Sequence, residues 1–324
     1  MPIFIACSPS TGSSLLRRIL NRHSQVFCGP ETSLFAKKEF YTNWNSYKDN
    51  FISRQSDQLL NVGWHHMKGL NLQDENEISN SLINKMASDS SDFVSFVNAY
   101  FDVLLHDNNK RIWAEKTPSN AFAIDDFKNL FPDSKLVHVV RDPYDTVASL
   151  INRGMSVYNA LTVYLLNVCQ CLEHKGEAYY QEVCYEELVV DPKTAVGDLC
   201  EFLGINFEAD MIESSAQEKG VDHMVGWNYK ETSQIGKKSV GRFDKLPEQT
   251  KALIHIGMQQ LQSVIGTSNK SYDDIFDSLK YIEKEVPVSN HNFYFQKEMF
   301  KDKFKRLMQK SYFRANNYPV TWIK

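Results

Sequence analysis

We predict an α/β fold of three layers, with a central parallel sheet and a helical insertion. Two observations carry this prediction: short apolar or β-branched runs recur along the chain, and helical patterns follow most of them. Strands that alternate with helices in this way form parallel sheets with helices on both faces. The predicted strands are Ile3–Cys7, Val26–Cys28, Arg111–Ala114, Leu136–Val140 and Glu182–Tyr185.

Helices are predicted where apolar residues recur every three or four positions. The longest spans Val157–Leu172. The helix after it has both ends marked: Asp191 is a typical N-cap, Pro192 suits the first turn, and Gly204 suits a helix end. The other predicted helices are Ser13–Arg22, Ser119–Leu130 and Tyr144–Asn152.

The chain is predicted to form one main domain over residues 1–266, with a helical C-terminal extension over 267–324. Between residues 35 and 101 the periodicity weakens and aromatic residues gather, so we expect a helical insertion that covers the active face. In the extension, apolar residues alternate with lysines at helical spacing, which predicts an amphipathic basic helix docked by its apolar face. Its apolar residues are Phe300, Phe304, Leu307 and Met308.

Composition argues against membrane-bound, secreted and nucleic-acid-binding proteins. With 42% hydrophobic residues and no apolar run near the ~20 residues of a membrane helix, a membrane-bound protein is not expected. The first residues lack the basic start of a signal peptide, so we expect a cytoplasmic protein. The net charge of −4 argues against a nucleic-acid partner.

Charge is distributed unevenly along the chain. Residues 291–324 hold eight Lys or Arg against two Asp or Glu, a local +6 that leaves −10 for the first 290 residues. The main body therefore disfavours a polyanionic substrate and allows a neutral or cationic one. The six cysteines show no pairing with histidines at zinc spacing, which indicates reduced core thiols and predicts no metal site.

A small-residue turn joins the first strand to the first helix, in the stretch CSPSTGSSLLRRIL that begins at Cys7. Backbone N–H groups of such a turn and the hydroxyls of Ser13 and Ser14 can cradle a phosphate group. An ATP-binding loop has a lysine before its hydroxyl residue, and Ser13 stands in that place. On its own, such a turn is more often a plain tight connection.

Further stretches strengthen the phosphate-loop reading. They are CGPETSLF from Cys28, WAEKTPSN from Trp113, KLVHVVRDPYDTVAS from Lys135, YEELVVDPKTAVGDLCEFLG from Tyr185 and SVGRF from Ser239. In order and spacing, over about residues 1–245, the chain resembles the sulfotransferases that use 3′-phosphoadenosine 5′-phosphosulfate (PAPS). Their motifs read PRSGTT, EKTP, RDP with a serine eight residues after the arginine, and YEDL. The resemblance implies a P-loop NTPase-like fold, PAPS as the cofactor, 3′-phosphoadenosine 5′-phosphate as its product, and no metal.

The resemblance also implies nucleotide-binding roles. The loop residues Pro9, Ser10, Thr11, Gly12, Ser13 and Ser14 would wrap the 5′-phosphosulfate. Arg141 and Ser149 would hold the 3′-phosphate and Tyr185 would contact adenine. Lys237, Lys238 and Arg242 would add cations near the 3′-phosphate. Plainer readings stay open: Arg141 could pair with Asp142, Tyr185 could be a core residue, and the lysines could form a solvated turn. Ser10 departs from the family, which has Arg or Lys there.

Two residues are expected to be catalytic. Glu31 matches the glutamate of the protein-tyrosine branch, whose CGEET resembles CGPET here, and would act as the general base. Lys116, in EKTP, would stabilise charge on the bridging oxygen. Alternatively, Glu31 opens a helix and Lys116 pairs with Glu115. His65 and His66, in the insertion, rank second as the base.

The expected function is transfer of a sulfuryl group from PAPS to a hydroxyl, or as second choice an amine, of a small-molecule acceptor. Secondary metabolism is the expected setting, and aromatic residues in 35–95 together with the Val157–Leu172 helix would build the acceptor pocket. Two alternatives remain: a P-loop kinase, which the missing loop lysine opposes, and a non-catalytic nucleotide-binding scaffold protein, which Ser10 suggests. The identity of the acceptor and the choice between monomer and homodimer are left open.

Overall fold

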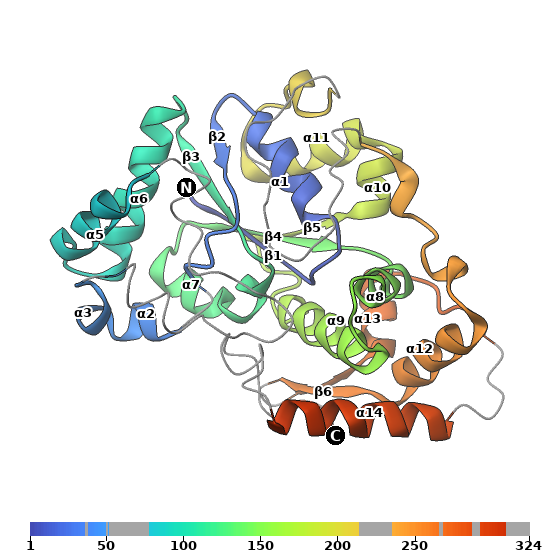
Figure 1. Cartoon of the computed structure of the whole chain (residues 1–324). Helices are drawn as coiled ribbons and strands as arrows, with labels where there is room; N and C mark the ends of the chain where they lie inside the picture. Colours follow the sequence, from blue (N-terminus) through green and yellow to red (C-terminus); the bar gives the residue numbers. More distant parts are fainter. Residues whose placement is uncertain are drawn as a thin grey trace.

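The computed structural model describes residues 1–35, 38–49, 51, 78–213, 235–265, 268–286 and 292–308. At its centre lies a five-stranded, all-parallel sheet of order β2-β3-β1-β4-β5 (Figure 1). The predicted fold class is confirmed, with strand limits moved by at most a few residues. The strands are β1 (Ile3–Cys7), β2 (Val26–Cys28), β3 (Ile112–Lys116), β4 (Lys135–Val140) and β5 (Tyr180–Cys184).

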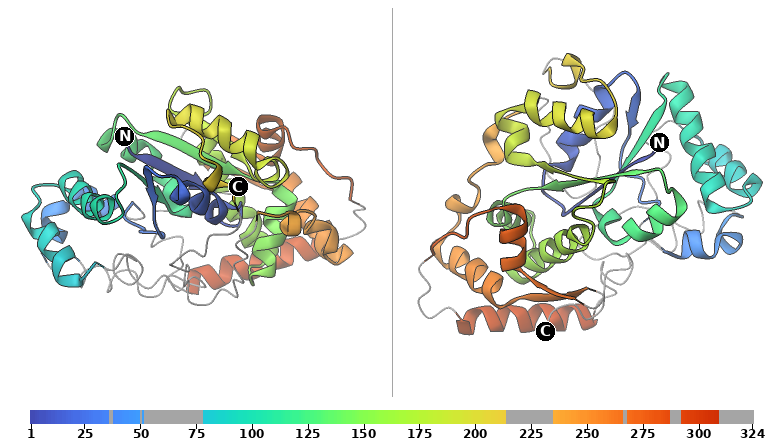
Figure 2. Two further views of the ribbon diagram at one scale, coloured as in Figure 1. Left: turned by 90° about the horizontal axis from the view of Figure 1, so that it is seen from above. Right: turned by 180° about the vertical axis from the view of Figure 1, so that it is seen from behind.

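Helices cover both faces of the sheet (Figures 1 and 2). On one face, Ile3, Ile5 and Cys7 of β1 pack with α1 (Ser13–Arg22) and α11 (Pro192–Leu203). On the other face, Phe4 contacts the ring of Phe127 in α7 (Ile124–Leu130) at a centroid distance of 3.8 Å. This alternation follows from the two-residue period of a strand, which sends successive side chains to opposite faces.

Most predicted helices have their predicted limits. α1 and α9 (Val157–Leu172) match, and α8 begins one residue early, at Pro143, and ends at Asn152. Asp191 caps α11 by accepting a hydrogen bond from the Thr194 N–H at 3.2 Å, and Gly204 ends it with a φ of 67°. The helix predicted over Ser119–Leu130 is instead a 3₁₀ helix, η1 (Pro118–Phe122), followed by α7, with non-helical Ala123 between them.

The insertion is helical, as predicted, and its described helices are α2 (Lys38–Thr42), α3 (Trp44–Tyr47), α5 (Asn80–Asp89) and α6 (Phe93–Asp107). Its aromatic side chains pack on one another: Trp44 stacks on Phe96 with centroids 5.1 Å apart, and Phe51 meets Phe96 at 4.7 Å. Phe40, Trp44 and Phe51 are buried. These three aromatics are therefore core residues and do not line an open pocket. His65 and His66 lie outside the described residues.

The C-terminal elements pack mainly on α9. They are α12 (Glu248–Gln260), the antiparallel pair β6 (Gln262–Ile265) and β7 (Ser268–Ser271), α13 (Tyr272–Leu279) and α14 (Asn292–Met308). The basic helix forms as predicted, but the predicted docking residues Phe300 and Phe304 are wrong, and the side chains of Leu307 and Met308 lie outside the described part of the chain. Phe295 is buried against Gly257, and Met299 is partly buried, whereas Phe300 and Phe304 are 71% and 58% exposed. The register of α14 is set by the small surface at Gly257, which admits the ring of Phe295.

Short elements complete the chain: α10 (Tyr185–Val190) and the 3₁₀ helices η2 (Ala209–Met211), η3 (Lys237–Ser239) and η4 (Phe243–Lys245). Among the described residues, no helix has the length and apolar character needed to cross a membrane.

Candidate functional site

The residues predicted to bind and react gather at one edge of the sheet. Three neighbouring strands, β3, β1 and β4, end at Lys116, Cys7 and Val140. In parallel sheets, ligands bind beyond the carboxyl ends of the strands. The phosphate loop, the EKTP stretch and Arg141 therefore come together although more than 100 residues separate the first from the last.

The phosphate loop leads into α1 through a sharp turn. Gly12 is the N-cap residue, with a φ of 94° and no side-chain cap, and the first turn of α1 carries no acidic residue. Ser10 also has a positive φ, 73°. The Thr11 hydroxyl donates to the Ser8 carbonyl at 2.8 Å, which closes the turn. An uncapped helix N-terminus of this kind attracts an anion.

Tyr185 packs directly on the phosphate loop. It is the first residue of α10, and its ring lies so close to Gly12 that a Cβ atom there would overlap the ring. The guanidinium of Arg141 lies on the same ring, with Cζ 4.9 Å from the centroid. The absence of a side chain at Gly12 thus lets an aromatic ring rest between the loop and Arg141.

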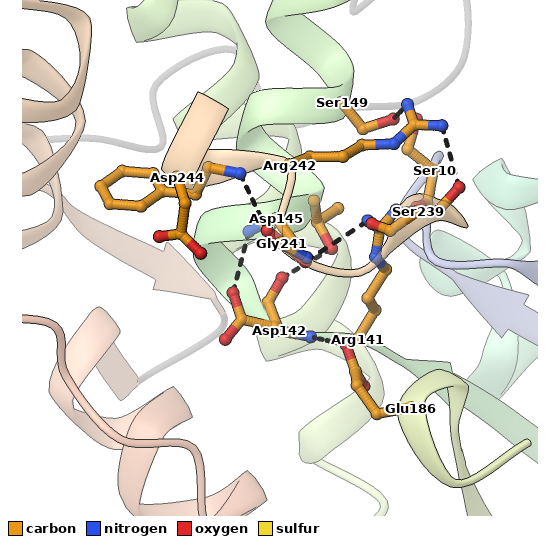
Figure 3. Close-up of polar contacts among 12 residues, drawn as sticks. Ser10, Arg141, Asp142, Asp145, Ser149, Glu186, Ser239, Gly241, Arg242 and Asp244 are labelled. Atoms are coloured by element: carbon orange, nitrogen blue, oxygen red, sulfur yellow. Dashed lines mark hydrogen bonds and ion pairs between the residues drawn. The ribbon is translucent and has the colours of Figure 1, made fainter. Parts of the chain in front are cut away.

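Arg141 is almost completely buried, with 3% of its surface exposed. Its Nη1 donates to the Ser10 carbonyl at 2.9 Å, and its Nη2 donates to the Ser239 carbonyl (Figure 3). Among the described residues, its ion-pair partner is the Asp145 carboxylate, one helical turn on, at 3.7 Å. The alternative pairing of Arg141 with Asp142 is therefore wrong.

Asp142 has a different task. Its side chain accepts from the Asp145 N–H at 2.8 Å and so caps α8, while its own N–H donates to Glu186 at 3.0 Å. Burial raises the pKa of the Asp142 carboxyl to about 6. Asp142 thus fixes the start of α8, on which Asp145 and Ser149 stand.

The SVGRF loop meets α8 at the same place (Figure 3). The Arg242 guanidinium donates to the Ser149 hydroxyl at 3.0 Å and to the Ser239 hydroxyl at 2.9 Å. The buried Asp145 carboxylate accepts from the Gly241 N–H at 2.7 Å and from the Phe243 N–H at 2.9 Å. Sequence reasoning missed Asp145, although its position one turn after Arg141 in RDPYD was a usable signal.

Lys237 and Lys238 lie on the exposed η3 helix, which contacts α10. Within the described part of the chain neither lysine makes an ion pair. They are brought near the Arg141 side of the site, but they do not share the close contacts of Arg141 and Arg242.

Glu31 and Lys116 form a buried ion pair on the other side of the site. The Lys116 ammonium donates directly to Glu31 Oε1, and the two residues are 0% and 8% exposed. Both plainer readings are therefore wrong. Glu31 lies in an irregular segment, because the next described helix begins at Lys38, and Lys116 pairs with Glu31 and not with Glu115. Strand alternation sends Glu115 and Lys116 to opposite faces of β3.

Glu115 holds the segment that carries Glu31. Its Oε1 accepts from the hydroxyls of Thr32 at 2.8 Å and Thr117 at 2.6 Å, and its Oε2 accepts from the Asn120 amide. The Ser33 N–H donates to the Thr117 hydroxyl at 3.2 Å. The PETS and EKTP stretches thus interlock along three successive residues, a role for Glu115 that spacing alone could not reveal.

The donor set fits an anionic nucleotide. The Arg141 Nε and the Ser10 hydroxyl are buried polar atoms without a hydrogen-bond partner among the described residues. Together with the uncapped start of α1, they leave donors for phosphate oxygens. Burial raises the pKa of the Cys7 thiol, beside Ser13, to about 11, so no thiolate competes with an anion there. Within the described ranges no group of three or more His, Cys, Asp or Glu side chains could hold a metal ion.

Fold and site together define an α/β protein with a P-loop-like anion site that lacks the loop lysine of ATP-binding proteins. The profile of the Sulfotransferase family matches residues 2–209, well over half of the chain. The chain belongs to the sulfotransferase family.

Curated relatives include protein-tyrosine sulfotransferases. The chain is 23% identical over 222 residues to protein-tyrosine sulfotransferase A of Caenorhabditis elegans, a match that covers 64% of this chain and 50% of the relative. It is 24% identical over 217 residues to protein-tyrosine sulfotransferase 2 of Gallus gallus, covering 63% and 51%. The chain thus spans about half the length of these two relatives.

Solved structures share the fold over most of their length. The sulfotransferase domain from the curacin biosynthetic pathway superposes with a TM-score of 0.59 at 19% identity, covering 89% of this chain and 99% of the domain. The sulfotransferase domain from the olefin synthase of Synechococcus PCC 7002 superposes with a TM-score of 0.56 at 18% identity, covering 88% and 96%.

Proposed function

We propose that this protein transfers the sulfuryl group of PAPS to a hydroxyl group of a small-molecule acceptor. The observation that carries the proposal is the buried Glu31–Lys116 pair beside the phosphate loop. A base and a cation in direct contact are the two groups that this reaction needs, one for the acceptor proton and one for the charge on the leaving oxygen.

The nucleotide would lie along the edge of the sheet. The N–H groups at the start of α1, with Ser13 and Ser14, would bind the 5′ end, and Pro9 and Thr11 would shape that turn. Arg141, Ser149 and Arg242 would bind the 3′-phosphate through charge-assisted hydrogen bonds. Tyr185 would contact the adenine from its place on Gly12, and Lys237 and Lys238 would add longer-range attraction.

Bound PAPS supplies an activated sulfuryl group that needs no redox change. Glu31 would accept the proton of the acceptor hydroxyl as the acceptor oxygen forms its bond to sulfur. Lys116 would stabilise the negative charge on the 5′-phosphate oxygen as its bond to sulfur breaks. Because both side chains are buried, their charges act in a medium of low dielectric constant, where each interaction is stronger than in water.

The two alternatives are less well supported. A kinase would need a cation where Ser13 stands at the start of α1. A scaffold protein would have no use for a lysine that is fully buried and committed to a carboxylate, since burial of a charged pair is costly.

A small-molecule acceptor is proposed over a protein tyrosine. Two of the solved structures of similar fold are domains from an olefin synthase and from the curacin pathway, and they match over almost their whole length. The tyrosine sulfotransferases match over about half of theirs. An amine is the second choice of acceptor group.

The test combines binding with transfer. Calorimetric titration with adenosine 3′,5′-bisphosphate is expected to show a dissociation constant in the micromolar range, which corresponds to a binding free energy of about −8 kcal/mol. Labelled PAPS is then offered with panels of alcohols, amines and tyrosine peptides, with and without EDTA. Transfer to an alcohol that persists in EDTA supports the proposal. Binding without any transfer points to a scaffold, and phosphate transfer from ATP restored by magnesium points to a kinase.

A further inference from the structure

We infer that Asp145 is a positioning residue that sets the preference of this site for a nucleotide bearing a 3′-phosphate. Asp145 contacts no part of the reacting centre, and it would act through the SVGRF loop, which presents Ser239 and Arg242. The inference rests on the proposed nucleotide site, and it adds to that site a residue that holds two of its groups in place.

The loop is held by the Asp145 carboxylate from both sides. Oδ2 accepts from the Gly241 N–H at 2.7 Å, and Oδ1 accepts from the Phe243 N–H at 2.9 Å (Figure 3). Gly241 has a φ of 75°, which lets the backbone turn so that these two N–H groups converge on one carboxylate. Asp145 is 3% exposed, so both of its hydrogen bonds are shielded from water.

These two hydrogen bonds to the loop determine which acceptors Arg141 and Arg242 can reach. With Gly241 fixed, the Ser239 carbonyl accepts from Arg141, and Arg242 lies between the hydroxyls of Ser239 and Ser149. The Asp145 carboxylate also lies 3.7 Å from Arg141 and offsets part of the repulsion between the two guanidinium groups. Other carboxylates nearby are engaged elsewhere: Asp142 caps α8 and Glu186 accepts from the Asp142 N–H and Tyr281.

The effect expected of Asp145→Asn on phosphate binding has the opposite sign to that of simple electrostatics. A carboxylate beside a phosphate site repels the phosphate, so on charge alone Asp145→Asn should tighten binding. If Asp145 positions the loop, the same change weakens binding of a 3′-phosphate, because an amide cannot accept both backbone hydrogen bonds. The 5′ end binds at α1, away from this loop, and should be little affected.

The experiment measures, by calorimetry on the same protein, the affinities for adenosine 3′,5′-bisphosphate and for adenosine 5′-phosphate. Where adenosine 5′-phosphate binds too weakly for direct titration, its affinity is measured by competition with the bisphosphate. In Asp145→Asn, affinity for adenosine 3′,5′-bisphosphate is expected to fall at least about tenfold, while affinity for adenosine 5′-phosphate changes less than about twofold. Asp244→Asn is the matched control. It removes the same charge from the next turn of the loop, but Asp244 is exposed and pairs with Lys284.

The outcomes separate the inference from the proposed function. If the wild-type protein binds neither ligand, the proposed function and the role of Asp145 are both wrong. If the wild type prefers the bisphosphate and Asp145→Asn keeps that preference or increases it, only the inference falls. A measurement on the unmodified protein guards against a variant that fails to fold: hydrogen exchange should show the Gly241 and Phe243 amides protected, and free exchange at both would overturn the inference.

Discussion

Two buried carboxylates, Glu115 and Asp145, organise the two halves of the site in different ways. Glu115 accepts mainly from side chains, the hydroxyls of Thr32 and Thr117, and locks the Glu31 segment onto β3. Asp145 accepts from backbone N–H groups and holds a loop from nearly 100 residues later in the chain. Each half brings a distant segment to the edge of the sheet by means of one carboxylate.

The halves differ in how their charged groups are paired. In the Glu31–Lys116 half, a carboxylate and an ammonium contact each other directly. In the other half, the Asp145 carboxylate lies 3.7 Å from the Arg141 guanidinium, and Arg141 and Arg242 donate hydrogen bonds to serine oxygens. We propose that the half with the directly paired charges moves a proton, and that the half with the two guanidinium groups binds a phosphate.

The largest effect is expected in the half with the charged pair. Glu31→Gln should lower kcat by about 10²-fold or more, since the amide cannot accept the acceptor proton. Affinity for adenosine 3′,5′-bisphosphate should stay within about twofold, because Glu31 lies away from the arginines. Turnover and calorimetry on the same preparation check this. Turnover like that of the wild type would remove Glu31 from the mechanism.

The next largest effect is expected at Gly12, where the Tyr185 ring packs on the phosphate loop. Gly12→Ala should lower affinity for the bisphosphate at least about tenfold, since the new methyl group would displace the Tyr185 ring. Gly154→Ala is a matched control: its φ is also 94°, and nothing lies within 4 Å of the added Cβ. Both variants carry the backbone cost of alanine in the left-handed region, about 1–2 kcal/mol.

Chemical denaturation of the two glycine variants measures that shared backbone cost, and calorimetry measures the effect on binding. Equal loss of affinity in both variants would show that the close approach of Tyr185 to Gly12 does not matter for binding.

A smaller effect is expected from loosening the Glu31 segment. Glu115→Gln keeps the shape of the side chain but removes the charge that its four donors face, and should lower the free energy of unfolding by about 1–3 kcal/mol. The kcat should fall severalfold with affinity for the bisphosphate unchanged. Glu182→Gln on β5, bonded to Tyr180, is the control and should leave kcat unchanged. A loss of stability with unaltered kcat would show that Glu115 supports the fold alone.

The sequence predicted the parts of the site that depend on local pattern. The turn before α1 and the helix from Asp191 to Gly204 could be read from spacing and capping residues, and both are present. Their signals lie within a few residues of one another, where propensity and capping act. The resemblance to known motifs then brought Glu31 and Arg141 into the same site.

The partners of these residues could not be predicted, because they depend on how distant segments meet. Thr32 and Glu115 are 83 residues apart, and Asp145 and Phe243 are 98 apart. Strand alternation decides that Lys116, and not Glu115, faces Glu31, but only the sheet order places β2 beside β3. The face on which α14 docks was missed for a similar reason, since Gly257 on α12 selects Phe295.

The loop that Asp145 holds is also the last part of the site to leave the ribosome. By the time Cys184 has been added, the chain already contains all five strands of the parallel sheet, Glu31 and Lys116, whereas Ser239 and Arg242 are still to come. At about 5–20 residues per second, that gap lasts several seconds. A nascent chain can thus build its sheet before the proposed 3′-phosphate site is complete. The donor nucleotide would stabilise the finished protein by mass action, but it could not assist the earlier folding of the sheet.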